Sequence, residues 1–220
     1  MEPKTAVITG GEGDLAKAIR GLLEADGWTV LAPGRAELDV TSPASVERFF
    51  SSVTTLDLLI NNAGVIADGP LVQMSEADFV RVLDVCLKGA FLCSQKAMWL
   101  MAKKRNGHIL NIGSFAALYG TAGQANYAAA KAGLIGLTKS TAFEYGAKNV
   151  RCNCLLPGLL DTKMTRHLMS DAATKDELTK THLLRKLNTV DDAARFIVFL
   201  DSMKGVSGQV FQLDSRISRW

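Results

Sequence analysis

The amino-acid sequence predicts an α/β fold in which one parallel β-sheet carries helices on both faces. Short apolar runs, which suit strands buried on both sides, alternate along the chain with stretches of helical length. Several of these runs end in Gly, Asn, Ser or Pro, residues that leave room for a ligand. The chain has 220 residues and shows no internal repeat, linker or low-complexity segment, so we expect one domain over residues 1–220.

Composition narrows the class of protein. Hydrophobic residues make up 48% of the chain and charged residues 21%, as is typical of soluble globular proteins. The net charge of +3 is too small for a dedicated nucleic-acid binder, and no apolar run is long enough to span a membrane. The first residues contain no signal-peptide h-region, and the four cysteines lack the spacing of a metal site. We therefore expect a cytoplasmic protein with reduced thiols, no metal, and no nucleic-acid or membrane partner.

The first strand is expected at 6–9 and leads directly into the glycine-rich turn 10–16, which a helix follows from Lys17 to Ala25. A G-x-G-x-x-A pattern begins at Gly11 in this turn. Glycines allow the backbone to approach a pyrophosphate, and the helix N-terminus adds free N–H groups. This order of elements predicts a dinucleotide site, although a plain glycine-rich turn is the simpler alternative.

A second strand is expected at 28–32, followed by Arg35 in the next turn. An acid here would bind the ribose 2′-hydroxyl of NAD, whereas an arginine suits the 2′-phosphate of NADP. NADP(H) is therefore favoured and NAD(H) stays possible, because Glu12 and Asp14 lie near the same loop and would repel a phosphate. Too few residues separate this strand from Asp39-Val40 for a crossover helix, so that part of the fold is shortened.

The next helix is expected to start at Ser42-Pro43, with the serine as its cap and the proline in its first turn. The apolar run 56–60 predicts a strand, and the residues that end it, 61–64, read Asn-Asn-Ala-Gly. These small residues again allow a ligand to approach. A long helical region follows over 75–104, with an interruption expected near Lys88-Gly89.

The strand expected at 109–112 and the Ala-rich helix expected at 126–145 carry the reactive residues. Tyr127 and Lys131 are four residues apart and so lie on one helix face. An ammonium this close lowers the pKa of a phenol by roughly 1–3 units, which makes tyrosine a usable acid and base. Ser114, just beyond the strand, can offer its hydroxyl to the same substrate oxygen. On its own, this spacing occurs often by chance and is better explained by an ordinary helix with an exposed Tyr and Lys.

The last part of the chain completes the alternation. A strand is expected at 150–156 and ends in Pro157-Gly158, a helix at 190–200, and a final strand at 209–213. Residues 159–188 between them mix polar and apolar side chains. This segment suits a mobile substrate lid, and an ordinary helical connection explains it equally well.

Six motifs, in order, make the chain resemble the short-chain dehydrogenase/reductase family along nearly its whole length, and most closely its 3-oxoacyl-carrier-protein reductase-like group. They are TGGEGDLA (9–16), DV (39–40), NNAG (61–64), NIGS (111–114), YAAAK (127–131) and PGLLDT (157–162). The resemblance implies a doubly wound Rossmann-type sheet and an NADP(H)-dependent enzyme that interconverts a carbonyl and a secondary alcohol of a small substrate.

The resemblance also implies the residues of the site. Tyr127 would be the proton donor or base, Ser114 would bind the substrate oxygen, and Lys131 would lower the pKa of Tyr127 and bind the nicotinamide ribose. The residues implied to contact the cofactor are Gly10, Gly13, Asp14, Leu15, Arg35, Asp39, Val40, Asn62, Ala63, Gly64, Tyr127, Lys131, Pro157, Leu160 and Thr162.

Three departures from the family pattern stand out. Asp14 occupies a position where the common glycine loop has glycine, and it would be compatible with a nearby pyrophosphate if it capped the helix. Cys86 stands where many members have an asparagine of a proton relay. Asp214-Ser215 follows the last strand, where a glycine pair is common.

Two other functions stay open, together with the assembly. The spacing of Gly10, Gly13 and Ala16 resembles that of nucleotide-sugar epimerases and dehydratases, although few residues remain for their substrate domain. Asp14 and Cys86 instead suit a non-catalytic, redox-sensing binding protein. The helix at 126–145 presents small residues to its surroundings, and in this family such a helix forms homodimers or homotetramers.

Overall fold

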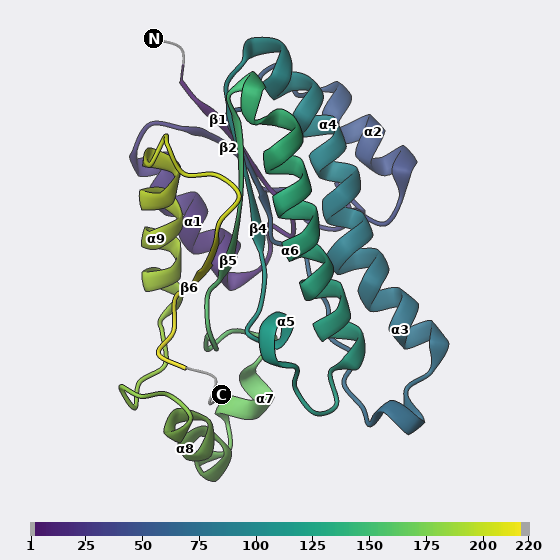
Figure 1. Cartoon of the computed structure of the whole chain (residues 1–220), viewed down its shortest axis with the longest axis vertical. Coiled ribbons are helices and arrows are strands. Elements are labelled where there is room, and N and C mark those ends of the chain that lie inside the picture. Colours follow the sequence, from purple (N-terminus) through teal and green to yellow (C-terminus); the bar gives the residue numbers. More distant parts are fainter. Residues whose placement is uncertain (1–2, 217–220) are drawn as a thin grey trace.

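The computed structural model describes residues 3–216 (Figure 1). Its centre is one sheet of six strands, all parallel, in the order β2-β1-β3-β4-β5-β6. This arrangement confirms the predicted doubly wound, Rossmann-type α/β fold. The strands are β1 Thr5–Ile8, β2 Thr29–Leu31, β3 Leu58–Asn61, β4 Gly107–Ile112, β5 Val150–Leu156 and β6 Val210–Gln212.

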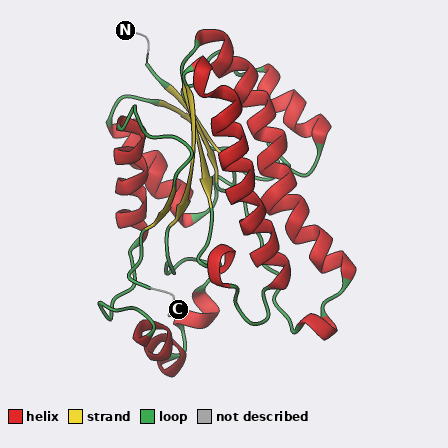
Figure 2. Cartoon of the chain, in the orientation of Figure 1, coloured by secondary structure: helices red, strands yellow, loops and turns green. Residues whose placement is uncertain are grey.

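Helices cover both faces of the sheet, as Figures 1 and 2 show. One face carries α1 (Asp14–Ala25) and α9 (Val190–Ser202), and the other carries α2 (Pro43–Ser51), α4 (Gly89–Lys104) and α6 (Ala125–Tyr145). The remaining helices are α3 (Glu76–Leu83), α5 (Ala116–Tyr119), α7 (Arg166–Met169) and α8 (Ala172–Lys180). No described helix has a stretch that is both long and apolar enough to cross a membrane.

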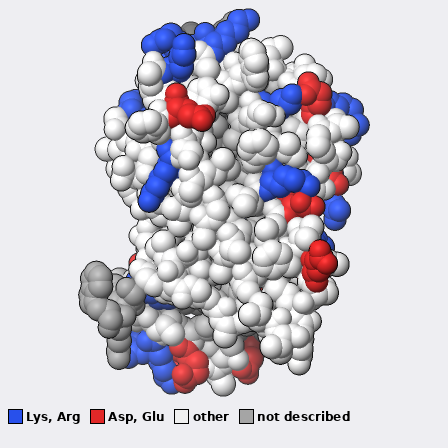
Figure 3. All heavy atoms as spheres, turned by 45° about the vertical axis from the view of Figure 1, so that its right-hand side comes forward, with Lys and Arg blue, Asp and Glu red and all other residues white. Residues whose placement is uncertain are grey.

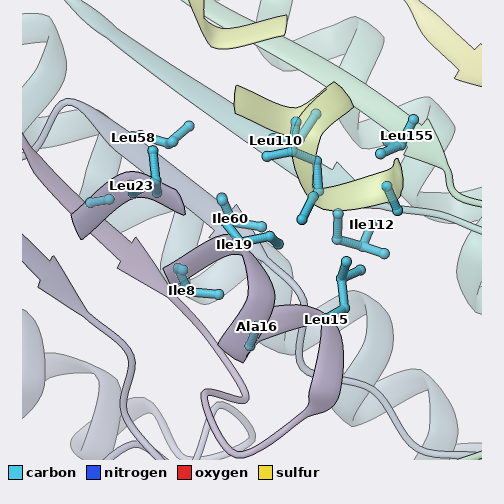
Figure 4. Packing of buried hydrophobic residues seen from close by; sticks show 14 of the residues in the cluster. Ile8, Leu15, Ala16, Ile19, Leu23, Leu58, Ile60, Leu110, Ile112 and Leu155 are labelled. Carbon is cyan, nitrogen blue, oxygen red and sulfur yellow. The ribbon is translucent and has the colours of Figure 1, made fainter. Parts of the chain in front are cut away.

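Most strand residues are apolar because the sheet packs on both sides. Ile8 and Ile60 face α1 and meet its fully buried Ile19 (Figure 4). The neighbouring Val7 and Leu59 point to the opposite face and pack in the cluster of α2 and α4. Successive side chains of β1 and β3 point to opposite faces, and both faces are buried. These two strands therefore lack the alternating polar positions of a half-exposed strand.

The connection after β2 is short, as predicted, since residues 32–42 form only turns and loops before α2. The start of α2 is also as predicted. Ser42 is its N-cap and accepts a hydrogen bond from Ser45 N at 3.3 Å, and Pro43 occupies the first turn.

The start of α1 and the course of the long helical region differ most from the sequence predictions. Helix α1 begins at Asp14, three residues before the predicted Lys17, because Gly13 in an extended conformation acts as N-cap without a side chain. Asp14 is therefore inside the helix and is not its cap. The long helical region does not break near Lys88-Gly89. It continues through a π-helical turn at Asp84–Lys88, which inserts into the helix without ending it.

A buried ionic cluster lies at the amino end of the sheet, opposite the ends of the strands that carry the motifs. The Asp201 carboxylate contacts Arg151 Nη2 at 3.2 Å, His108 Nδ1 at 3.1 Å and Lys204 Nζ at 3.3 Å. Arg151 also donates to the carbonyl oxygens of Asp201 and Val206, at 2.8 and 3.2 Å. Every charge in this group has an opposite charge or a carbonyl oxygen as its partner. Because His108 lies on β4, Arg151 on β5 and Asp201 on α9, these contacts hold the three elements together.

His108 is neutral in this cluster. Asn153 Nδ2, which can only donate, lies 3.1 Å from His108 Nε2, so that nitrogen accepts and the proton sits on Nδ1, facing Asp201. Burial lowers the pKa of His108 to about 4, an effect that the nearby Asp201 opposes.

We expect stability to fall as the pH is lowered from 6.5 to about 4. The unfolded chain takes up a proton on this histidine near its ordinary pKa of 6.5, while the folded protein takes it up only near 4. Below 6.5 the unfolded state thus binds more protons, and the loss reaches about 3 kcal/mol. Urea denaturation at several pH values measures it. His108→Gln should flatten this dependence, and an identical pH profile in the variant would contradict the assignment.

Candidate active site

A cavity of about 560 Å³ opens at the carboxyl end of the sheet. The loops that leave β1, β2, β3, β4 and β5 form its floor, and residues of 159–188, named the lid segment for their predicted role, form one wall. In open parallel sheets the strands deliver their following loops to this edge, so it is where ligands bind. Helices α5, α7 and α8 lie at the same end of the molecule in Figure 1.

Every residue predicted for the site lines this one cavity. The predicted catalytic residues and the predicted cofactor contacts come from segments up to 152 residues apart (Gly10 to Thr162), and the fold brings them together. They are Gly10, Gly13, Asp14, Leu15, Arg35, Asp39, Val40, Asn62, Ala63, Gly64, Ser114, Tyr127, Lys131, Pro157, Leu160 and Thr162.

The glycine-rich turn packs tightly against the end of β2. Gly10 has a φ of 68°, which favours glycine, and a Cβ on Gly11 would lie 2.0 Å from the carbonyl oxygen of Ala32. Gly11 N donates to Pro33 O at 2.9 Å. No side chain fits at Gly11. Gly10 and Gly13 of the turn, and Asp14 and Leu15 at the start of α1, line the cavity. A pyrophosphate fits such a backbone cradle.

The turn after β3 is tied to the glycine-rich turn. Thr9 Oγ1 accepts hydrogen bonds from the amides of Asn62 and Ala63, both at 3.0 Å. Asn62 Nδ2 donates to the carbonyl oxygens of Thr9 and Gly10, at 3.1 and 3.3 Å. The Asn62 side chain therefore holds the two loops together as one rigid wall of the cavity.

Arg35 lies at the mouth of the cavity with 85% of its side chain exposed. Its Nη2 is 4.0 Å from Asp39 Oδ2, a loose contact in solvent. The Asp39 carboxylate is held instead by Thr41, whose hydroxyl and amide donate to Oδ1 at 2.7 and 3.0 Å and lower the pKa of Asp39. The Arg35 guanidinium thus keeps donors for an anion.

Asp14 connects the glycine-rich turn to the lid segment. Its Oδ2 accepts a hydrogen bond from Lys163 N at 2.8 Å, across 149 residues of sequence. The carboxylate does not cap α1 and contacts the lid segment. No local sequence pattern signals this contact, because its partner is a backbone amide.

Helix α6 positions Tyr127 and Lys131. Its first turn is anchored by Asn126, which accepts from Tyr127 N at 2.7 Å and donates to Ala67 O at 2.9 Å. Lys131 is buried, with Nζ 5.4 Å from the centre of the Tyr127 ring, and donates to Ile112 O at 2.6 Å. Ser114, two residues beyond Ile112, lines the cavity beside them.

The charges at this site are strongly coupled. Burial raises the pKa of Tyr127, whereas the Lys131 ammonium and a hydrogen bond with Ser114 lower it. The ammonium acts in the direction predicted from the sequence, but burial outweighs it. Burial alone would lower the pKa of Lys131, but the negative charge that Tyr127 carries as a phenolate raises it. At neutral pH Tyr127 is a neutral phenol, because its pKa is raised above its ordinary value.

Cys86 is buried beside this pair, in the π-helical turn. Its thiol lies 3.6 Å from Val65 O, to which it donates. A Cβ on Gly64 would lie 3.7 Å from the Cys86 sulfur and 4.0 Å from Lys131 Nζ, so both groups border one small space. A thiol is a weaker hydrogen-bond partner than an asparagine amide in this place.

Comparison with known proteins decides the family. A family model described as enoyl-(acyl carrier protein) reductase matches residues 5–215. The chain belongs to the short-chain dehydrogenase/reductase family. Among its relatives is the 3-oxoacyl-[acyl-carrier-protein] reductase FabG of Thermotoga maritima, 35% identical, with 97% of each chain covered. FabG of Escherichia coli is 36% identical over 78% of this chain and 79% of its own length.

Like other short-chain dehydrogenases/reductases, the protein is an oxidoreductase that acts on CH–OH groups with NAD(P). It resembles 3-oxoacyl-carrier-protein reductases in particular. Among the described residues of this short-chain dehydrogenase/reductase, no group of three His, Cys, Asp or Glu side chains is arranged to hold a metal ion.

Some residues of the cavity were not predicted from the sequence. Phe115 follows Ser114, and Arg216 reaches the cavity from the segment after β6. One sequence feature points to the segment that carries Arg216. Asp214-Ser215 stands where a glycine pair is common in short-chain dehydrogenases/reductases.

Proposed function

We propose that this enzyme is an NADP(H)-dependent carbonyl reductase in which Tyr127 is the acid and base. The observation that carries the proposal is the convergence of Ser114, Tyr127 and Lys131 in one cavity with the glycine-rich turn. The bound nicotinamide would supply the hydride. The neutral phenol of Tyr127 donates its proton to the substrate oxygen, and the Ser114 hydroxyl binds the same oxygen.

Lys131 assists without contacting the reacting carbon. Ile112 O takes one of its three donors and fixes Nζ in place. Its remaining donors serve the ribose hydroxyls of the cofactor, and its charge stabilises the phenolate that Tyr127 leaves after giving up its proton.

The direct test is reduction of a panel of ketones and aldehydes with NADPH. Multiple turnovers with at least one member support the proposal, and none with any member would overturn it. The redox-sensing alternative is less well supported, since Cys86, the thiol on which it rests, is buried and donates to Val65 O. Burial also raises the pKa of Cys93 and Cys152 to about 12 and of Cys154 to about 11. Buried, protonated thiols are poor redox sensors.

Arg35 supports the choice of NADP(H) over NAD(H), because its exposed guanidinium stands at the cavity mouth, where the 2′-phosphate would lie. We expect Arg35→Gln to weaken NADPH binding about tenfold and to change NADH binding less than about twofold. Calorimetric titration with both cofactors measures this. Arg20→Gln, an exposed arginine of α1 paired with Glu24, is the matched control. Unchanged NADPH affinity in Arg35→Gln would contradict the preference.

We infer that the enzyme assembles as a homodimer or homotetramer through α4 and α6. Figure 3 brings this side forward and shows a broad area without charged side chains in its middle. Trp99 of α4 and Phe143 of α6 are exposed by 79% and 93%. Such apolar exposure is typical of an interface. A solution mass equal to one chain of 23.7 kDa would contradict assembly.

The proposed location is the cytoplasm. All four cysteines are free and buried, which suits a reducing compartment.

A further inference from the structure

The segment that follows β6 folds back over the carboxyl end of the sheet and forms a wall of the cavity. Asp214, whose side chain is 1% exposed, holds this turn. Its Oδ1 accepts from Gln212 Nε2 at 2.9 Å and from Arg216 N at 3.2 Å, and its Oδ2 accepts from Arg216 Nε at 2.7 Å. With this many bonds to one carboxylate, the turn presents Arg216 in a fixed position.

Arg216 is also fixed from the side of the catalytic residues. Its guanidinium carbon lies 3.9 Å from the centre of the Phe115 ring, a close cation–π contact. Phe115 directly follows Ser114 in the chain. A cation is thus held beside the predicted reaction centre, and its side chain, 17% exposed, lines the cavity.

The geometry of the guanidinium leaves one edge for a ligand. Asp214 Oδ2 binds the edge formed by Nε and Nη2. Within residues 3–216, no group accepts a hydrogen bond from Nη1, so the edge formed by Nη1 and Nη2 keeps its donors. A planar carboxylate matches two parallel N–H groups of such an edge better than a round or apolar group does.

The lid segment contributes apolar side chains to the same cavity, those of Met164, Leu168 and Leu178. Two of the acidic residues that line the cavity are engaged in other contacts. Asp14 binds the Lys163 amide, and Asp68 accepts from Gln124 Nε2 at 2.8 Å. Arg216 therefore shares the cavity with these apolar side chains, and its charge partner Asp214 is buried behind it.

The lid segment is attached to the same turn. Leu183 N donates to Ser215 O at 3.1 Å, and Leu184 N donates to Ser215 Oγ at 3.2 Å. His182, also buried, places Nε2 3.7 Å from Asp214 Oδ2. Arg216 and the end of the lid segment thus form one connected wall, and the position of the cation follows that of the lid.

From these contacts we propose that Arg216 determines specificity by binding a carboxylate of the substrate, so that the preferred substrates are oxo acids with an apolar spacer between the carbonyl and the acid. The inference rests on the proposed carbonyl reductase function. Each oxo acid would be reduced to the corresponding hydroxy acid, with the hydride from NADPH and the proton from Tyr127.

The test compares oxo acids of increasing chain length with their methyl esters, which keep the reacting carbonyl and lack the charge. In the wild type, kcat/KM should favour the acid of best-fitting length. Arg216→Gln should lower kcat/KM for that acid by roughly 10- to 100-fold and for its ester by less than about threefold, while Arg216→Lys should retain part of the preference. Arg185→Gln, an arginine of the lid segment outside the cavity lining, is the control and should change neither value.

A binding measurement separates this inference from the proposed function. Calorimetry of an unreactive dicarboxylate, with NADPH present, needs no turnover and should show weaker binding to Arg216→Gln than to wild type. Equal losses for acid and ester, a wild-type preference for the ester, or unchanged dicarboxylate binding would each overturn the role of Arg216. Reduction of uncharged carbonyls alone would leave the reductase standing and reject the oxo-acid preference.

Discussion

Replacing Tyr127 with phenylalanine should lower kcat for carbonyl reduction roughly a thousandfold while leaving NADPH affinity within about threefold of the wild type. A positioned general acid contributes roughly a hundred- to ten-thousandfold to such a reaction, and the variant removes only the hydroxyl that carries the proton. The ring stays, so the neighbouring Lys131 keeps its packing and its bond to Ile112 O. Steady-state kinetics with NADPH and calorimetric cofactor titration measure the two quantities separately.

The matched control is Tyr145→Phe, at the far end of the same helix and among partly buried residues of the α2 and α4 cluster. It should leave kcat unchanged. Loss of cofactor binding together with activity in Tyr127→Phe would assign Tyr127 a structural role. The pH profile adds a second readout. Because burial raises the pKa of Tyr127, reduction should persist through neutral pH and decline only in alkaline solution, where the phenol loses its proton.

Replacing Asp201 with asparagine should lower the free energy of unfolding by about 3 kcal/mol, because it leaves Arg151 buried without its carboxylate. Burial lowers the pKa of Arg151, and Asp201 is the charge that opposes this effect. Such a loss is a large fraction of the roughly 5–15 kcal/mol that stabilise a typical domain. Urea denaturation at pH 7 measures it.

The same helix supplies the control for this prediction. Asp191 pairs with Arg195 at 2.7 Å on the surface of α9, with more than half of each side chain exposed. Asp191→Asn should change stability by less than about 1 kcal/mol, since exposed ion pairs contribute little. Equal effects of the two variants would show that burial does not set the importance of the Asp201 cluster.

The sheet and its order of elements could be predicted from the sequence, because strands buried on both faces leave largely apolar runs. The run 150–156 marks β5 with its observed bounds, and Ser42-Pro43 marks the start of α2. The start of α1 could not be predicted, because its cap is the backbone of Gly13. The π-helical turn at 84–88 was also not predicted. A break in the helix and one residue inserted into it disturb the sequence pattern near Lys88 in a similar way.

The site was predictable to the extent that its residues sit at strand ends or share one helix face. Ser114 meets the first condition, and Tyr127 and Lys131 meet the second. The contact of Asp14 with Lys163 N and that of Arg216 with Phe115 meet neither, because they join segments more than a hundred residues apart. The direction of the pKa shift of Tyr127 could not be predicted either, since the burial that raises this pKa is a property of the folded cavity.

Strand β4 carries His108 near its amino end and leads to Ser114 just beyond its carboxyl end, roughly 20 Å away at the usual rise of a strand. The ionic cluster that stabilises the fold and the predicted reactive groups therefore lie at opposite ends of one strand. For laboratory evolution toward new substrates, this separation is useful. Among the described lid residues only Leu160 belongs to a buried apolar cluster. A library of variants over 159–188 and 214–216 would therefore vary the substrate side of the cavity. It would leave the buried cluster around Asp201 unchanged.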